Sequence, residues 1–226
     1  MPPSPPRPLA TGTLPGLDLE SGARDRVLGP GVLLLAGRAR ATAPGLIAQI
    51  QAIAHAAPFR RMTTQGGRTM SVAMTNCGTL GWISDSRGYR YTTHDPLSGQ
   101  PWPALPDIFT ALAAEAAAEA GYPGFTPDAC LINRYEPGTR LTLHQDRNEH
   151  DFGQPIVSVS LGLPAVFLWG GPARSDRVQR VPLEHGDIVA WGGPARLAHH
   201  GIHPLAEGTH ALTGRTRLNL TFRRAG

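Results

Sequence analysis

Lysine is absent from this sequence of 226 residues, so all 21 basic side chains are arginines. Cysteine is almost absent: Cys77 and Cys130 are too few for a four-thiolate zinc site or a disulfide framework, and they fit a reducing compartment. No apolar run approaches the roughly 18 to 20 residues of a membrane span, and the longest early run, 32–36, is shorter than a signal-peptide core. We therefore expect a soluble, cytoplasmic protein.

The charge that is present is small and local. The formal net charge is +4, and residues 60–95 contain five arginines and two aspartates, so most of the excess lies in one segment. Arginine has a planar fork of donors that suits carboxylates and phosphates. A coding bias toward arginine and alanine is the alternative explanation for the missing lysine.

The composition predicts one domain rich in short strands. With 27 glycines and 22 prolines, the chain has many turns, which argues against a helical bundle, yet 41% hydrophobic residues support a core. Residues 1–25 begin with PPSPPRP and lack apolar periodicity, so we expect a flexible Pro-rich tail, followed by a single domain over 26–226.

The pattern along the chain is mainly β with flanking helices. Residues 31–37 read as a buried strand, and helices are expected from Thr42 to Pro58 and from Pro106 to Gly121. After residue 129 the chain consists of short strands broken by turns, typical of a sandwich or open barrel. We expect the Gly186-Asp187 turn in EHGDIVAWGG to close a hairpin.

A candidate metal site begins at His144 and Asp146. They lie two apart in RLTLHQD, which alternates like a strand, so both side chains point to the same side of the sheet. A third ligand is required, and His200 in HHGIHP is the natural choice because its neighbour His199 must point the other way. Two histidines and one carboxylate suit a non-haem Fe(II) oxygenase. The other candidates for the third ligand are His150, His185, His199, His203 and His210.

The last strand, RTRLNLTFRR, has one polar and one apolar face. Alternation places Arg217, Asn219 and Arg223 on the polar face, with Leu218 and Phe222 opposite. An ordinary sandwich strand would turn the polar face to water. A 2-oxoglutarate cosubstrate instead needs a fixed cation for its distal carboxylate, which a bidentate arginine supplies.

With these residues in place, the sequence resembles the AlkB-type Fe(II)- and 2-oxoglutarate-dependent dioxygenases that repair alkylated nucleic acid. The likeness covers the chain from about residue 30. The motifs that carry the resemblance are MSVAMTNCG, GYPGFTPDACLINRYEPG, LHQD, PIVSVSLGLPAVF, LEHGD, WGG, HGI and LNLTFR.

The resemblance implies a fold and a set of roles. The fold would be a double-stranded β-helix (jelly-roll) core over about 129–226, preceded by a nucleotide-recognition lid over 60–95. The implied iron ligands are His144, Asp146 and His200. Arg217 would pair with the distal carboxylate of 2-oxoglutarate, and Arg223 would lie near its iron-bound end. Asn133, Tyr135 and Asn219 would hydrogen-bond the cosubstrate.

The lid segment has its own chemistry. Trp82, Tyr89 and Tyr91 are interleaved with arginines, which is typical of single-strand or flipped-base binding; a mobile loop with half-buried rings is the alternative. By resemblance, Trp82 stacks on the damaged base, Tyr89 meets backbone phosphate, and Arg174 borders the pocket. Met74 would line it.

The implied reaction is oxidative demethylation of N1-methyladenine and N3-methylcytosine, preferably in single-stranded DNA. 2-Oxoglutarate and O₂ become succinate and CO₂, and the methyl group leaves as formaldehyde. Duplex DNA, RNA or protein are alternative substrates. Two other classes stay open: a zinc hydrolase built on the His₂Asp site, and a non-catalytic nucleic-acid-binding module. We expect a monomer without membrane association.

One position departs from the family pattern. Two residues after the Asp ligand, AlkB-type pockets commonly carry a carboxylate that accepts from the exocyclic amine of the base, and here the residue is Asn148. An amide keeps an acceptor oxygen, but it lacks negative charge and adds donors. We therefore expect a weaker or shifted preference between the two lesions, with Glu149 as a neighbour that could compensate.

Overall fold

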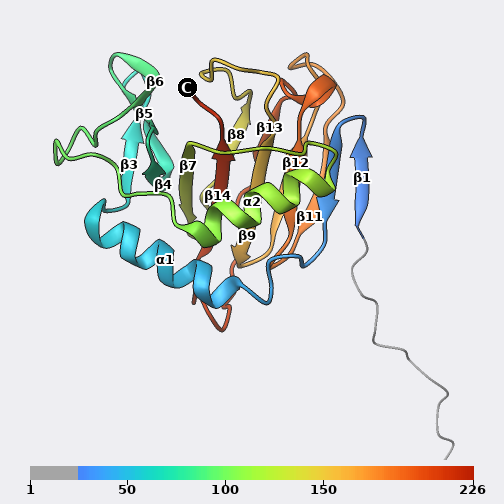
Figure 1. The fold of residues 1–226 in the computed structure, drawn as a ribbon, viewed down its shortest axis with the longest axis horizontal. Helices are drawn as coiled ribbons and strands as arrows, with labels where there is room; N and C mark the ends of the chain where they lie inside the picture. Colours follow the sequence, from blue (N-terminus) through green and yellow to red (C-terminus); the bar gives the residue numbers. More distant parts are fainter. Residues whose placement is uncertain (1–24) are drawn as a thin grey trace, which may run out of the picture.

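The computed structural model describes residues 25–226, so the predicted tail lies outside the described residues except for its last position. The described chain forms two β-sheets packed face to face with two helices on the outside, as expected for a double-stranded β-helix (Figure 1). The fold class predicted from the sequence is confirmed.

The larger sheet has eight strands in the order β1-β2-β12-β9-β14-β7-β4-β3. Its strands, in chain order, are β1 (Arg26–Gly29), β2 (Val32–Leu35), β3 (Arg60–Thr63), β4 (Thr69–Gly78), β7 (Ala129–Tyr135), β9 (Ile156–Gly162), β12 (Ile188–Trp191) and β14 (Arg217–Arg223). The neighbouring pairs are antiparallel, and β14 lies between β9 and β7.

The smaller sheet has four strands in the order β11-β10-β13-β8. Its members are β8 (Leu141–His144), β10 (Ala165–Trp169), β11 (Gln179–Leu183) and β13 (His200–Ile202). A separate hairpin of β5 (Gly81–Asp85) and β6 (Gly88–Thr92) forms a third sheet of two strands beside the core.

The helices cover the outer face of the larger sheet. Helix α1 (Ala43–Ala56) and helix α2 (Asp107–Glu119) share a hydrophobic cluster with Leu218, Leu220 and Phe222 of β14. The apolar face of this strand is therefore occupied by helices. Its polar face points the other way, between the two sheets, where every residue of β14 is also buried. Neither helix of the described part is long and apolar enough to cross a membrane.

The expected hairpin around Gly186 and Asp187 is wrong. The turn itself exists: Gly186 has a φ of +88°, and the Asp187 carboxylate accepts from the backbone N–H of Glu184 at 2.7 Å and of Gly37 at 2.7 Å. However, β11 pairs with β10, whereas β12 pairs with β9 and β2, so the two strands belong to different sheets. The turn carries the chain from one sheet to the other.

Candidate metal and cosubstrate site

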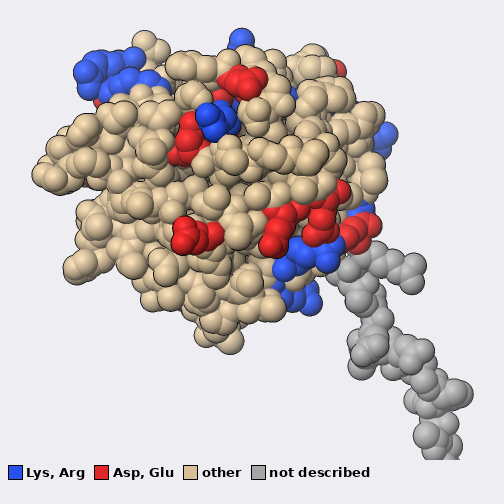
Figure 2. Space-filling model, viewed as in Figure 1, with Lys and Arg blue, Asp and Glu red and all other residues tan. Residues whose placement is uncertain are grey.

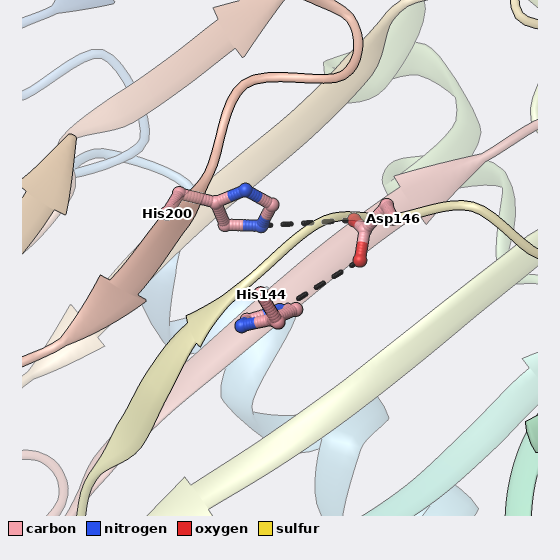
Figure 3. Close-up of side chains that lie close together, drawn as sticks. All are labelled: His144, Asp146 and His200. Atoms are coloured by element: carbon pink, nitrogen blue, oxygen red, sulfur yellow. Dashed lines mark ion pairs between the residues drawn. The ribbon is translucent and has the colours of Figure 1, made fainter. Parts of the chain in front are cut away.

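Three side chains from different elements converge between the sheets. His144 ends β8 and His200 begins β13, and the two residues are direct partners in the antiparallel register. Asp146 follows two residues after β8. Nε2 of His144 lies 3.7 Å from Oδ1 of Asp146, and Nε2 of His200 lies 3.8 Å from Oδ2 (Figure 3). The candidate ligand atoms all lie within 4.8 Å of one another, which is close enough for one ion to contact all three.

Both imidazoles are oriented by backbone carbonyls. Nδ1 of His144 contacts the carbonyl of Thr142 at 2.9 Å, and Nδ1 of His200 contacts that of Ala198 at 3.1 Å. A carbonyl only accepts, so each Nδ1 carries a proton and each Nε2 is the nitrogen that can bind a metal ion. Burial, reinforced by the neighbouring His144, lowers the pKa of His200 to about 4, which keeps its imidazole neutral.

Arg223 holds the carboxylate between the two rings. Its Nε and Nη2 both donate to Oδ2 of Asp146, at 2.9 Å and 2.6 Å, which leaves Oδ1 available for a metal ion. Burial alone would raise the pKa of Asp146, but the charge and hydrogen bonds of Arg223 outweigh burial and hold it well below its usual range. Asp146 is therefore ionised over the whole physiological pH range.

The inner face of the larger sheet carries the predicted cosubstrate residues. Arg217 is 1% exposed; its Nη2 donates to Oγ of Ser160 at 3.0 Å, while its Nε and Nη1 have no partner within the described chain. Its guanidinium carbon lies 4.9 Å from the centre of the Tyr135 ring. Nδ2 of Asn133 donates to Oδ1 of Asn219 at 3.2 Å, and Oδ1 of Asn133 is a further buried atom without a partner.

A buried guanidinium with two unused donors is costly unless an anion joins it. Burial lowers the pKa of Arg217, which is the sign of a cation lacking a carboxylate partner. These unused atoms belong to the paired strands β7 and β14, on the face that points to the space between the two sheets. They fit a small dicarboxylate that reaches from a metal ion to Arg217.

The β5–β6 hairpin, which lies within the predicted lid, presents two stacked rings. The rings of Trp82 and Tyr89 are 5.5 Å apart with 15° between their planes, and Tyr89 is 48% exposed. Nε1 of Trp82 donates to Oδ1 of Asn148 at 3.2 Å. Because an indole nitrogen can only donate, the Asn148 amide must turn its oxygen to Trp82 and its NH₂ group elsewhere.

Arginine side chains gather over the hairpin. Figure 2 shows basic side chains at the upper left, where Figure 1 places the tip of the β5–β6 hairpin, while acidic side chains lie mainly over the α2 side of this face. Arg90 donates two hydrogen bonds to the Asp85 carboxylate, at 2.6 Å and 2.8 Å. The Arg87 side chain is 75% exposed and makes a longer contact of 3.6 Å with the same carboxylate. Arg87 is therefore the more available of the two for an external anion.

Two further predicted residues lie at different depths. Arg174 is outside the core, and its Nη1 donates to the carbonyl of Leu143 at 2.7 Å, directly before His144. Met74 is 2% exposed, belongs to the core cluster between the sheets, and is the register partner of Asn133. Met74 thus supports the wall of the inner face, and Arg174 sits at its edge.

Sequence reasoning missed a buried ionic group beside Asp146. Glu149 is 6% exposed and receives Tyr91 Oη at 2.6 Å and Arg196 Nη2 at 3.1 Å. Burial raises the pKa of Tyr91 well above its usual value, so its hydroxyl stays protonated and donates. Strict alternation from Asp146 would place Asn148 on the side of Asp146 and Glu149 on the opposite side, yet Asn148 is exposed and Glu149 is buried. Glu149 is therefore not placed to compensate for the amide of Asn148.

The comparisons with known proteins agree with this site. Residues 31–223 match the family model described as the 2OG-Fe(II) oxygenase superfamily, which defines the class of protein. The chain is 58% identical over 198 residues to the alpha-ketoglutarate-dependent dioxygenase AlkB of Salmonella typhimurium, covering 88% of this chain and 92% of that protein. It is 56% identical to the Escherichia coli protein of the same name, with the same coverage.

A solved structure titled as that of OsALKBH1 superposes with a TM-score of 0.80 at 29% identity, covering 89% of this chain and 100% of that chain. The chain thus belongs to the AlkB family of 2-oxoglutarate- and Fe(II)-dependent dioxygenases. It uses the cofactors of that family, Fe(II), 2-oxoglutarate and O₂.

Proposed function

We propose that this enzyme oxidatively demethylates N1-methyladenine and N3-methylcytosine in nucleic acid, with alkylated single-stranded DNA as the preferred substrate. The observation that carries the proposal is a set of three features: the His144, Asp146 and His200 group, the two unused donors of the buried Arg217, and the Trp82 ring bonded to the loop after Asp146. Oxidation beside a stacking surface for a base is the chemistry that this arrangement serves.

The residues fit Fe(II) as the metal. Nε2 of His144, Nε2 of His200 and Oδ1 of Asp146 supply two neutral nitrogens and one anionic oxygen, and Arg223 neutralises the other carboxylate oxygen. When bound, Fe(II) together with 2-oxoglutarate and O₂ supplies the oxidant that hydroxylates a methyl group, with release of succinate and CO₂.

The inner face of the larger sheet then binds and orients the cosubstrate. Arg217 offers two free donors to the distal carboxylate, and Tyr135 packs under its guanidinium. Asn133 and Asn219 offer amide groups along the same face. Arg223 keeps Asp146 ionised next to the chelating end, so we assign it a catalytic as well as a binding role.

The lid holds the base over the metal. A methyl group on the Watson–Crick edge weakens base pairing, so the damaged base leaves a duplex at reduced cost and leaves a single strand at almost none. Trp82 stacks on the extruded base, Tyr89 and the exposed arginines of the hairpin meet backbone phosphate, and Arg174 borders the entrance. Residues 60–95 form this lid, and 129–226 form the catalytic core within one domain.

After hydroxylation the protein needs no further group. The hydroxyl of the hydroxymethyl substituent loses its proton to water, and its oxygen forms the C=O bond of formaldehyde. The N–C bond breaks at the same time and returns its electron pair to the ring nitrogen. The chain's part is to hold the base in place and exclude water. All proposed ligands come from one chain, so we assign a monomer, and the free thiols of Cys77 and Cys130 suit a cytoplasmic enzyme.

RNA is the alternative substrate within the same chemistry, because the stacking surface does not read the sugar. A zinc hydrolase would leave the free donors of Arg217 without a task.

The test is direct. A single-stranded oligonucleotide with one N1-methyladenine is incubated with enzyme, Fe(II), 2-oxoglutarate and air, and its mass is measured. We expect the loss of one CH₂ group together with formaldehyde and succinate in equal amounts, and no reaction with His200→Ala. Turnover of 2-oxoglutarate without repair of this lesion or of N3-methylcytosine, in DNA or RNA, would reject the function.

A further inference from the structure

The carboxylate of Glu149 joins three parts of the fold that are far apart in the sequence. Tyr91 of β6 donates to Oε1 at 2.6 Å, and Arg196, which follows the short helix η1 (Gly193–Ala195), donates to Oε2 at 3.1 Å. Arg223 of β14 lies 3.4 Å from Oε1 through its Nε. The side chain of Glu149 is 2% exposed, so these donors replace water around it.

The same two arginines also hold Asp146. Arg223 binds Oδ2 of its carboxylate, and Nη1 of Arg196 donates to its backbone carbonyl at 3.0 Å. Two buried carboxylates and two buried guanidiniums therefore balance each other before any metal is considered. Removing one of the carboxylates leaves an excess positive charge next to the position of a dication.

The lid hairpin reaches this group through few contacts. Within the described residues, two side-chain hydrogen bonds connect it to the loop after Asp146. Trp82 donates to Asn148 at an exposed position, and Tyr91, which is half-buried, donates to the buried Glu149. A hydrogen bond to a buried carboxylate is stronger than one screened by water. The Tyr91 bond is the firmer of the two links between the hairpin and the loop.

We infer that Glu149 is a positioning residue that ties the lid hairpin to the metal-ligand loop. Through Tyr91 it fixes the strand next to the one that carries Trp82, and through Arg223 and Arg196 it fixes the ligand Asp146. The inference rests on the proposed function, because it assumes that the hairpin binds the methylated strand. It assigns to Glu149 and Tyr91 a role that involves no contact with base, cosubstrate or metal.

Two variants separate the two halves of this role. Tyr91→Phe removes one hydroxyl and leaves the ring, so it removes only the hydrogen bond between the hairpin and Glu149. Glu149→Gln removes the charge that balances Arg223 and Arg196, so it affects the lid and the metal site together. Tyr122→Phe is the matched control: its hydroxyl donates to the carbonyl of Gly31 at 2.9 Å and takes no part in the bonds between the hairpin and the loop after Asp146.

The readouts are the affinity of metal-free protein for a fluorescent N1-methyladenine oligonucleotide, the anaerobic affinity for Fe(II) alone, and the kinetic constants. Tyr91→Phe should weaken oligonucleotide binding and raise its KM about tenfold, the effect of one hydrogen bond to a charged group, with kcat and Fe(II) affinity near those of the parent. Glu149→Gln should weaken both affinities. Tyr122→Phe should bind both ligands like the parent.

The inference would be overturned if Tyr91→Phe bound the oligonucleotide as tightly as the parent. It would also be overturned if Tyr91→Phe lost affinity for the oligonucleotide and for Fe(II) equally, because general destabilisation has that effect. If Glu149→Gln does not fold, Tyr91→Phe still decides. If the parent neither binds nor repairs methylated oligonucleotides, the proposed function fails instead. An unchanged Fe(II) affinity in Glu149→Gln would overturn the part of the inference that links Glu149 to the metal ligand Asp146.

Discussion

Replacing Arg217 with methionine should remove the anchor for the cosubstrate and little else. Arg217 is buried with two unused donors, and methionine keeps most of its length without the charge. Losing a buried charged hydrogen-bond partner costs about 3 kcal/mol, which corresponds to a rise on the order of 100-fold in the 2-oxoglutarate concentration for half-maximal turnover. Fe(II) affinity should stay within a few-fold of the parent, because Arg217 touches none of the three candidate ligands.

The stability of this variant gives an independent check. Arg217 has no carboxylate partner in the described chain, so its burial is unfavourable when 2-oxoglutarate is absent. We expect Arg217→Met to have a Tm no lower than the parent without 2-oxoglutarate, and to lose the rise in Tm that 2-oxoglutarate gives the parent.

Arg215→Met is the control for this experiment, since Arg215 is two residues away, exposed, and paired with Glu207. It should behave like the parent in both measurements. An Arg217→Met enzyme with parental 2-oxoglutarate dependence would refute the assignment, and a large loss of Tm would show that the side chain serves the fold.

Four further outcomes can be measured. Trp82→Ala should weaken turnover of methylated oligonucleotide by about 1 to 3 kcal/mol, one base stack, while succinate formation without substrate continues; parental turnover would remove Trp82 from the base site. His200→Ala should abolish Fe(II) binding and His199→Ala should not; equal losses would reverse the assignment. Asn148→Asp should raise rates on the cationic lesions, because the parent amide gives its oxygen to Trp82; identical rates on both lesions would show that the position is silent. Burial lowers the pKa of His185 below its usual 6.5, so in this pH range the unfolded chain binds more protons than the folded chain. The parent therefore loses stability as the pH falls from about 7 to 5, and His185→Gln should lose less. An unchanged pH slope in urea unfolding would contradict this.

Local periodicity accounts for the parts of the fold and site that the sequence predicted. The alternation in RTRLNLTFRR assigns Arg217, Asn219 and Arg223 to one face of β14, and burying the apolar face under two helices leaves the polar face inside the molecule. The spacing of His144 and Asp146 also predicts that their side chains lie close together, and they do so although Asp146 follows two residues after the end of β8. These predictions need only the geometry of one strand.

Features that depend on distant partners could not be read locally. The Gly186-Asp187 turn was recognised from its residues, but turn chemistry does not specify the strands that pair afterwards, and here they enter different sheets. Glu149 gave no local sign of burial, because the donors that make it tolerable, Tyr91 and Arg196, are 58 and 47 residues away.

The most direct test of the central claim, that the inner face binds Fe(II) and 2-oxoglutarate side by side, is an anaerobic absorption titration. Adding 2-oxoglutarate to the Fe(II) protein should produce the visible charge-transfer band of a bidentate chelate, saturating at one equivalent. The band should require far more 2-oxoglutarate in Arg217→Met and be absent in His200→Ala. A protein that binds Fe(II) tightly but develops no band at saturating 2-oxoglutarate would contradict the account.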